Sequence, residues 1–201
     1  KDEAAGAEYA VSDFNLKTGR VAPGVPTKFE MSAQIRANQP KTDVKLQVAG
    51  TLNPDLDQQV FTLAGLSVKV NGEAAGITNL SADLRADIEA RMRNQQIDIV
   101  KLNLDVSGNL GKDSFKAKLS APKIEKIAGA LSVNNLAADV GGTVAGVTLS
   151  EGALRVPQLT MDLDKQTVIV DGITFKAKGK RDADSFDATF DAPKVSISKD
   201  K

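Results

Sequence analysis

Apolar and polar residues alternate along most of this chain, which is typical of strands with one buried and one wet face. Short runs with residues of turn-forming type stand between the alternating segments. These are Pro23-Gly24, Asn71-Gly72, Gly108-Asn109, Gly141-Gly142 and Asp171-Gly172. The alternation predicts long strands, and the runs predict that tight turns separate them.

One pattern recurs: apolar-x-apolar-x-x-apolar-x-apolar-x-apolar-x-Gly. Its third apolar position falls at Leu66, Leu102, Leu136 and Ile173, at intervals of 102 − 66 = 36, 136 − 102 = 34 and 173 − 136 = 37 residues. A second repeat relates residues 113–124 to residues 184–195, at an offset of 71, with seven of twelve positions identical. The chain therefore repeats a hairpin-sized unit of about 36 residues.

The x-x step inside this pattern has a structural meaning. One extra residue in a regular strand sends every later side chain to the opposite face, whereas a β-bulge absorbs that residue and bends the strand. The steps are Ala64-Gly65, Val100-Lys101, Asn134-Asn135 and Asp171-Gly172. We therefore expect four strands bulged at equivalent places, each turning at its glycine into a return strand.

The expected fold is all-β: an antiparallel meander of long bulged strands that forms a strongly curved sheet, either a half-barrel or a groove, with at most one short helix. We expect a single elongated module over 1–201, with the repeat units between 58 and 195. Residues 1–26 would supply an entry strand and a Pro/Gly turn.

Two segments leave the choice of element open. Leu80, Leu84, Ile88 and Met92 recur at helical spacing, but Leu80–Met92 also alternates and occupies the place of a return strand, so we favour a strand. The segment from Pro122 to Gly129 predicts a short helical turn or an irregular crossing.

Composition excludes several classes of function. The 26 basic and 26 acidic residues cancel, so no basic surface for nucleic acid is expected. The chain contains no cysteine and no histidine, which removes thiol nucleophiles and the commonest general base and metal ligand. Aromatic residues make up only 4% of the chain, so an aliphatic core is expected.

No catalytic constellation is evident. Asp162 and Asp164 could form an acid pair on one strand, but a solvated sheet face explains them more simply. The acidic run from Arg181 to Asp191 resembles a calcium loop without its glycine and terminal glutamate, and a charged hairpin turn is favoured. Gly141-Gly142 with Gly146 lacks the lysine of a phosphate loop. We therefore expect no enzyme, no cofactor and no metal.

The order of these elements resembles the AsmA family. The resemblance is carried by Phe14–Gly19, Gly65–Gly72, Leu80–Met92 leading into Ile99–Gly108, and Leu119–Ile124. It implies a periplasmic module of the cell envelope, held at the inner membrane by an N-terminal helix that this chain lacks. It also implies phospholipid acyl chains as partners, with other envelope proteins as further partners, and a role in outer-membrane biogenesis.

The repeat supplies candidate groove-lining positions for such a module. They are Leu66, Val68, Val70, Leu102, Leu104, Val106, Ile173 and Phe175, with Phe115 and Phe186 on return strands. Two readings stay open: an open hydrophobic β-groove for phospholipid, and a closed β-sandwich that spaces or docks envelope proteins without lipid. A hydrolase with converging carboxylates is a distant third.

Overall fold

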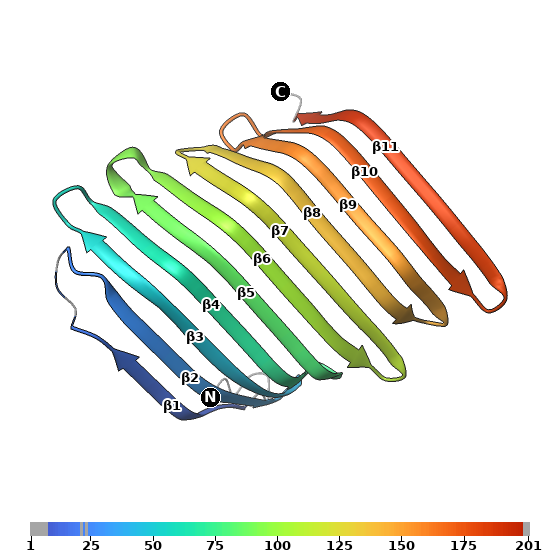
Figure 1. Cartoon of the computed structure of the whole chain (residues 1–201), viewed down its shortest axis with the longest axis horizontal. Helices are drawn as coiled ribbons and strands as arrows, with labels where there is room; N and C mark the ends of the chain where they lie inside the picture. Colours follow the sequence, from blue (N-terminus) through green and yellow to red (C-terminus); the bar gives the residue numbers. More distant parts are fainter. Residues whose placement is uncertain (1–7, 21, 23, 199–201) are drawn as a thin grey trace.

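The protein is a single antiparallel sheet, described here from a computed structural model of residues 8–20, 22 and 24–198. Eleven strands follow one another in chain order across the sheet, each hydrogen-bonded to the next (Figure 1). The strands are β1 (Tyr9–Thr18), β2 (Thr27–Asn38), β3 (Lys41–Asp55), β4 (Val60–Ala74), β5 (Ile77–Arg91), β6 (Gln96–Leu110), β7 (Asp113–Ile127), β8 (Ala130–Val144), β9 (Val147–Asp162), β10 (Thr167–Arg181) and β11 (Asp184–Ser198).

The predicted all-β meander is therefore confirmed, and the sheet is open rather than closed. The one helix among the described residues is a short 3₁₀ segment, η1 (Met92–Asn94). Strand β5 covers Leu80–Arg91, so the strand interpretation of the 80–92 segment was right. A β-sandwich would need a second sheet, whereas all eleven described strands belong to one.

Several predicted turns were wrong. Asn71-Gly72, Gly108-Asn109, Gly141-Gly142 and Asp171-Gly172 all lie inside strands, and the segment 122–127 is the regular end of β7. The reversals come three and four residues after the repeat glycine, for example at Ala75-Gly76 and Ala145-Gly146, where both residues have positive φ. Two positive φ angles are the requirement of a type I′ hairpin turn. Pro23 lies outside the described residues. Gly24 lies in a turn, and its backbone N–H donates a hydrogen bond to the Pro54 carbonyl.

The predicted bulge positions carry a distinct backbone conformation. The second residue of every x-x step is left-handed: Gly65, Lys101, Asn135 and Gly172 have φ of 60°, 56°, 50° and 77°. Together these residues mark a line across the sheet, which we call the fold line. A left-handed residue interrupts the regular pleat and bends the strand at that point.

The return strands meet the fold line in a way that the repeat pattern did not predict. The register on either side places Pro122 opposite Lys101, Pro157 opposite Asn135 and Pro193 opposite Gly172. Because both partners carry the extra residue, the β6–β7 and β10–β11 registers continue unchanged across the line. Proline has no N–H to donate, so a place where the ladder is already interrupted suits it.

At the fold line strand β5 lacks the extra residue, so β4 and β6 are bulged against it there. The bulge of β5 itself lies near the hairpin end, at Asn79, where φ is 51°. Asp87 occupies the gap at the fold line. Its carboxylate accepts a hydrogen bond from the Gly65 N–H at 2.7 Å and another from the Lys101 ammonium at 2.8 Å. These two contacts hold the pKa of Asp87 below its ordinary value, and the Lys101 bond is the larger cause. Asp87 therefore joins two left-handed bulges through one side chain.

Candidate apolar binding face

Apolar side chains form rows that run across the sheet from strand to strand. One row takes a single residue from each of the eleven strands, in direct register. It consists of Leu16, Met31, Val48, Val68, Leu84, Leu104, Leu119, Ala138, Leu154, Phe175 and Phe190. We call it the Leu104 row, after its β6 member. With ten spacings of about 4.8 Å between strands, this row is roughly 48 Å long.

Three further rows run beside it and are named in the same way. The Val106 row joins Ala33, Leu46, Val70, Ala82, Val106, Ala117, Val140, Gly152, Ala177 and Ala188. Across the fold line, the Ile99 row joins Thr27, Leu52, Leu63, Ile88, Ile99, Ile124, Val133, Leu159, Val170 and Val195. The Ile97 row joins Pro54, Phe61, Ala90, Ile97, Lys126, Leu131, Met161, Val168 and Ile197.

All four rows lie on one face of the sheet, the apolar face. Strand β5 establishes this, because its backbone is regular between Leu84 and Ile88, which belong to rows on opposite sides of the fold line and are four residues apart. Side chains an even number of residues apart in a regular strand share a face. Within the four rows Lys126 is the only charged residue.

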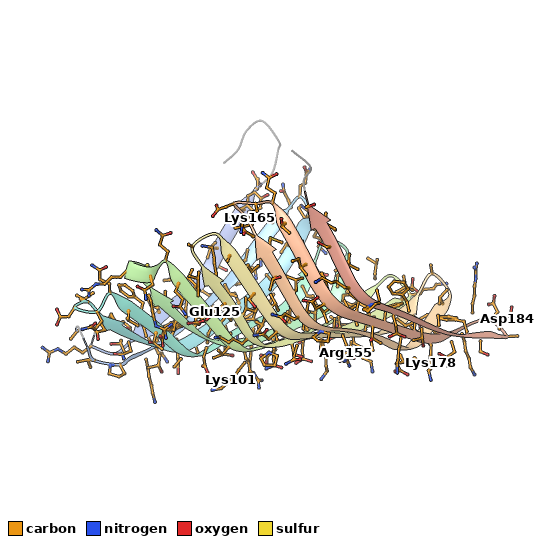
Figure 2. All side chains as sticks on the ribbon, turned by 90° about the horizontal axis from the view of Figure 1, so that it is seen from above. Lys101, Glu125, Arg155, Lys165, Lys178 and Asp184 are labelled. Carbon is orange, nitrogen blue, oxygen red and sulfur yellow. The ribbon has the colours of Figure 1, made fainter. Side chains whose placement is uncertain are left out.

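The opposite face is charged, and the sheet bends away from it. Figure 2 shows Lys101 and Arg155 along the outer side of the bent ribbon. Arg155 alternates with Leu154 and Val156, so it marks the face opposite to the apolar rows. The apolar face is thus the inner side of the bend, and its rows run along a trough whose floor is the fold line.

Nothing in the described chain covers this trough. Extensive contacts between elements occur only between neighbouring strands, and no large side chain is fully buried. The accessible surface is 12982 Å², against roughly 9,100 Å² expected for a compact monomer of this 21.2 kDa mass. The excess indicates one layer with both faces open to solvent.

The ten groove positions predicted from the repeat all lie on this face. Leu104, Val68 and Phe175 are in the Leu104 row, and Val70 and Val106 are in the Val106 row. Leu66, Leu102 and Ile173 lie beside the fold line, whereas Phe115 and Phe186 lie toward the hairpin ends, opposite Gly108 and Gly179. None of the ten is buried, and Phe175 and Phe186 are 40% and 39% exposed.

Further residues line the trough that were not among the ten positions predicted from the repeat. The Ile99 and Ile97 rows form the second wall of the trough, and none of their members was among the ten predicted positions. The signal was present in the sequence, since these residues are the first two apolar positions of the repeat. They were missed because the ten positions were taken from the half of the repeat that follows the x-x step and from the return strands, although the expected bulge already places both halves on one face.

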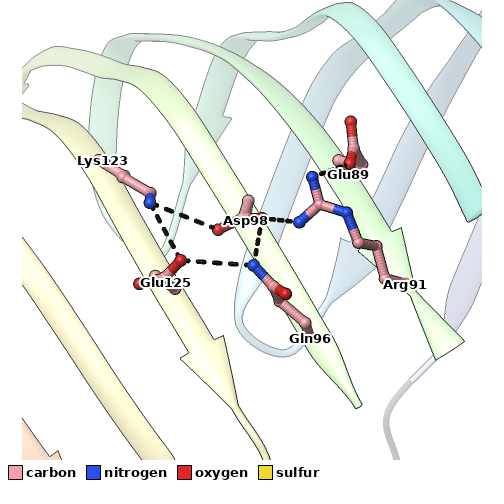
Figure 3. A network of polar contacts seen from close by, with 6 residues as sticks. All are labelled: Glu89, Arg91, Gln96, Asp98, Lys123 and Glu125. Atoms are coloured by element: carbon pink, nitrogen blue, oxygen red, sulfur yellow. Dashed lines mark hydrogen bonds and ion pairs between the residues drawn. The ribbon is translucent and has the colours of Figure 1, made fainter. Parts of the chain in front are cut away.

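The outer face holds a network of polar contacts (Figure 3). Glu89, Asp98 and Glu125 stand in one row on β5, β6 and β7. Arg91 pairs with Glu89 and, at 2.7 Å, with Asp98, and Lys123 lies 3.0 Å from Glu125. Gln96 donates to Asp98 at 2.8 Å, so the three carboxylates are bridged by donors from the neighbouring positions. The network therefore lies on the outer side of the trough wall and joins three neighbouring strands.

The other candidate sites form no reactive arrangement. Asp162 ends β9, whereas Asp164 lies in the following turn, so the two do not share a strand face as predicted. The Asp162 carboxylate accepts bonds from the side-chain and backbone nitrogens of Lys165, which hold its pKa below the ordinary value. The acidic run from Arg181 includes a two-residue hairpin turn, as favoured. In the described residues, no group of carboxylates is placed to hold a metal ion.

Gly141 and Gly142 belong to β8 rather than to a loop. No helix of the described chain is long and apolar enough to cross a membrane. Comparisons of the chain with protein-family models, curated proteins and solved structures gave no match. The resemblance to the AsmA family therefore stays a prediction.

Proposed function

We propose that this chain is a non-catalytic lipid-binding module, whose trough receives phospholipid acyl chains along the apolar rows. The observation that carries the proposal is the uncovered Leu104 row, apolar in all eleven strands. A continuous exposed apolar face of this length promotes aggregation in water unless a ligand or partner covers it.

The dimensions of the trough suit this ligand. One leaflet of a bilayer is about 15 Å of hydrocarbon, half of a core of about 30 Å, so a row of roughly 48 Å could hold several acyl chains end to end. Each methylene removed from water contributes about 0.8 kcal/mol. Since no row contains a site of deep enclosure, the trough favours sliding of a chain over its retention at one point.

The chemistry of the trough walls agrees with a carrier rather than an enzyme. Within the four apolar rows Lys126 is the one charged group, and the carboxylates of Glu89, Asp98 and Glu125 face the other side. A cation near the rim of the trough suits an anionic headgroup whose tails lie on the rows. By the resemblance described above, we place this module in the periplasm, where lipid must cross water between two membranes.

The decisive experiment is native mass spectrometry, with lipid extraction, of the chain purified from a bacterial envelope. Co-purifying phospholipid is the expected result. The double variant Leu104→Asp with Phe175→Asp should lose it. A matched control, Asn103→Asp with Thr174→Asp, adds the same charge one residue away on the outer face and should keep it.

Circular dichroism should show both variants folded before the comparison is made. If the wild-type chain carries no lipid, and takes up no fluorescent phospholipid from vesicles, the proposal fails. The apolar face would then be a docking surface for another envelope protein.

A further inference from the structure

Strand β11 forms one edge of the sheet. Among the described residues β11 is paired with β10 only, while its repeat equivalent β7 is paired on both sides, with β6 and β8. Residues 113–124 of β7 and 184–195 of β11 share seven of twelve positions. The two strands also meet the fold line at equivalent prolines, Pro122 and Pro193.

We propose that the free edge of β11 binds an extended polypeptide segment as a twelfth, antiparallel strand, in the register that β8 adopts on β7. Main-chain hydrogen bonds would supply the affinity, as in other cases of strand addition to an open sheet edge. This proposal does not rest on lipid binding.

The exposure of apolar side chains on β11 indicates that the place of a neighbouring strand is unfilled. On β7, Leu119 faces Ala138 of β8 and is half-buried. Its equivalent on β11, Phe190, is 58% exposed, and Ile197 further along the strand is 62% exposed. A long apolar edge left in this state is a site for pairing with another chain.

The register specifies what the segment must contain. With the offset of 71 applied to the β7–β8 pairs, Phe186 takes the place of Phe115, whose partner is Gly142. A side chain at Gly142 would stand 2.1 Å from the Ser114 carbonyl oxygen, and its φ is 135°. The segment therefore needs a glycine opposite Phe186 and alternate apolar residues opposite Ala188, Phe190 and Ala192.

Charge distinguishes this segment from β8 itself. On β7, Lys116 and Ser120 face Gly141 and Ala137 of β8. On β11 the equivalent residues are Asp187 and Asp191, both exposed. Opposite charges directly across a strand pair stabilise it, so the segment carries Lys or Arg at these two places.

A second folded copy does not meet these requirements. Strands β2–β10 of any copy are already paired on both sides, which leaves β1 and β11. Strands β1 and β11 run in the same direction, since they are the first and last of an antiparallel meander of eleven. Placing β1 of a second copy antiparallel to β11 would therefore turn the apolar face of that copy to the other side. Strand β11 of a second copy contains no glycine to stand opposite Phe186. The partner is accordingly a segment that is not yet part of a sheet.

The test uses a fluorescent 15-residue peptide with the sequence of β8, Ala130–Val144, in which Ala137→Lys and Gly141→Lys supply the cations. Fluorescence anisotropy should show binding to the folded chain in low salt. A control peptide with Asp at the same two places should bind about tenfold more weakly. The protein variant Asp187→Lys with Asp191→Lys should reverse this preference, which simple stickiness of the edge would not do.

Register is checked by disulfide formation, which is clean because the chain has no cysteine. Phe190→Cys in the protein should cross-link to a peptide carrying Ala138→Cys, and not to one carrying Leu136→Cys or Val140→Cys. The proposal is overturned if neither peptide binds or if both bind equally. It is also overturned if two copies pair through β11, seen as a dimer that Phe190→Cys and Ile197→Cys cross-link.

Discussion

The backbone conformation of single residues determines where these strands can bend. Two kinds of glycine occur in β4, and they differ in how replaceable they are. Gly65 has φ 60° and open space where a Cβ would stand. Gly72 has φ 144°, and a Cβ there would lie 2.1 Å from the Asp43 carbonyl oxygen.

We expect Gly72→Ala to lower the free energy of unfolding by about 3 kcal/mol or more, because strain and a backbone clash act together. Gly65→Asn should cost under about 1 kcal/mol, since Asn135 and Lys101 adopt the same conformation at equivalent places. Urea denaturation of both variants measures the difference. Equal losses would mean that the fold line, and not the clash, dominates.

Asp87 makes the fold line sensitive to acid. Its pKa is lowered in the folded chain, so its contribution to stability is fully present above the ordinary value of about 3.9 and is lost as the pH falls through the lowered value. Asp87→Asn should therefore destabilise the chain at about pH 7, with the gap to wild type closing as the pH falls below about 3.9.

Urea midpoints at several pH values measure this gap. Asp83→Asn is the matched control on the same strand, because Asp83 pairs on the surface with its strand neighbour Arg85, at 2.9 Å, and has no hydrogen bond or ion pair with a bulge residue among the described residues. A gap that stays constant with pH would show that the Asp87 carboxylate stabilises the bulges equally when protonated.

At the scale of the element, alternation predicted the strands well and their ends poorly. The period of two identifies the apolar face without knowledge of the fold, and the x-x step correctly marked Gly65, Lys101, Asn135 and Gly172. The repeat glycines misled, because Gly72 and Gly142 serve a close approach of backbones rather than a reversal. The turns themselves begin at Ala75 and Ala145, and alanine is not a typical turn residue although it adopts positive φ here.

The sequence pattern could not predict which residues lie opposite one another on neighbouring strands. Asp98 reads as an ordinary polar position of β6, and only the register shows that it lies between Glu89 and Glu125. Likewise, Pro122 led to the prediction of a short helical turn or an irregular crossing, because proline in a central strand is unusual. Its place opposite a left-handed residue explains it, and such a partner is visible only in three dimensions.

The outer network makes a prediction about β5. Arg91 bridges Glu89 and Asp98, so Arg91→Ala leaves three aligned carboxylates with Lys123 as their remaining cation. We expect a loss of about 1 kcal/mol, within the range of partly exposed pairs, and a smaller loss in high salt. Thermal unfolding at two salt concentrations measures it.

The matched control is Arg155→Ala, on the same outer face, whose ion pair with Asp139 joins no further carboxylate among the described contacts. If Arg91→Ala and Arg155→Ala have equal effects, the row of carboxylates has no energetic consequence, and the network of Figure 3 is a set of independent surface pairs.

For the whole molecule, the open layer predicts an unusual heat capacity of unfolding. An unfolded chain of this mass exposes about 30,700 Å², so folding to 12982 Å² buries roughly 17,700 Å², where a compact monomer would bury roughly 21,600 Å². Heat capacity follows the apolar part of this area. We therefore expect a value at least about a fifth below the 12–15 cal/mol/K per residue typical of globular proteins.

Calorimetry of the purified chain with and without phospholipid tests this prediction together with the lipid proposal. Lipid that covers the trough only in the folded state should raise the unfolding temperature in a concentration-dependent way. It should also bring the heat capacity change toward the ordinary range, since unfolding then exposes the rows as well. An ordinary value in the lipid-free chain would mean that something already covers the rows. Sedimentation of the same sample would then separate self-association, which depends on concentration, from closure of the sheet upon itself, which does not.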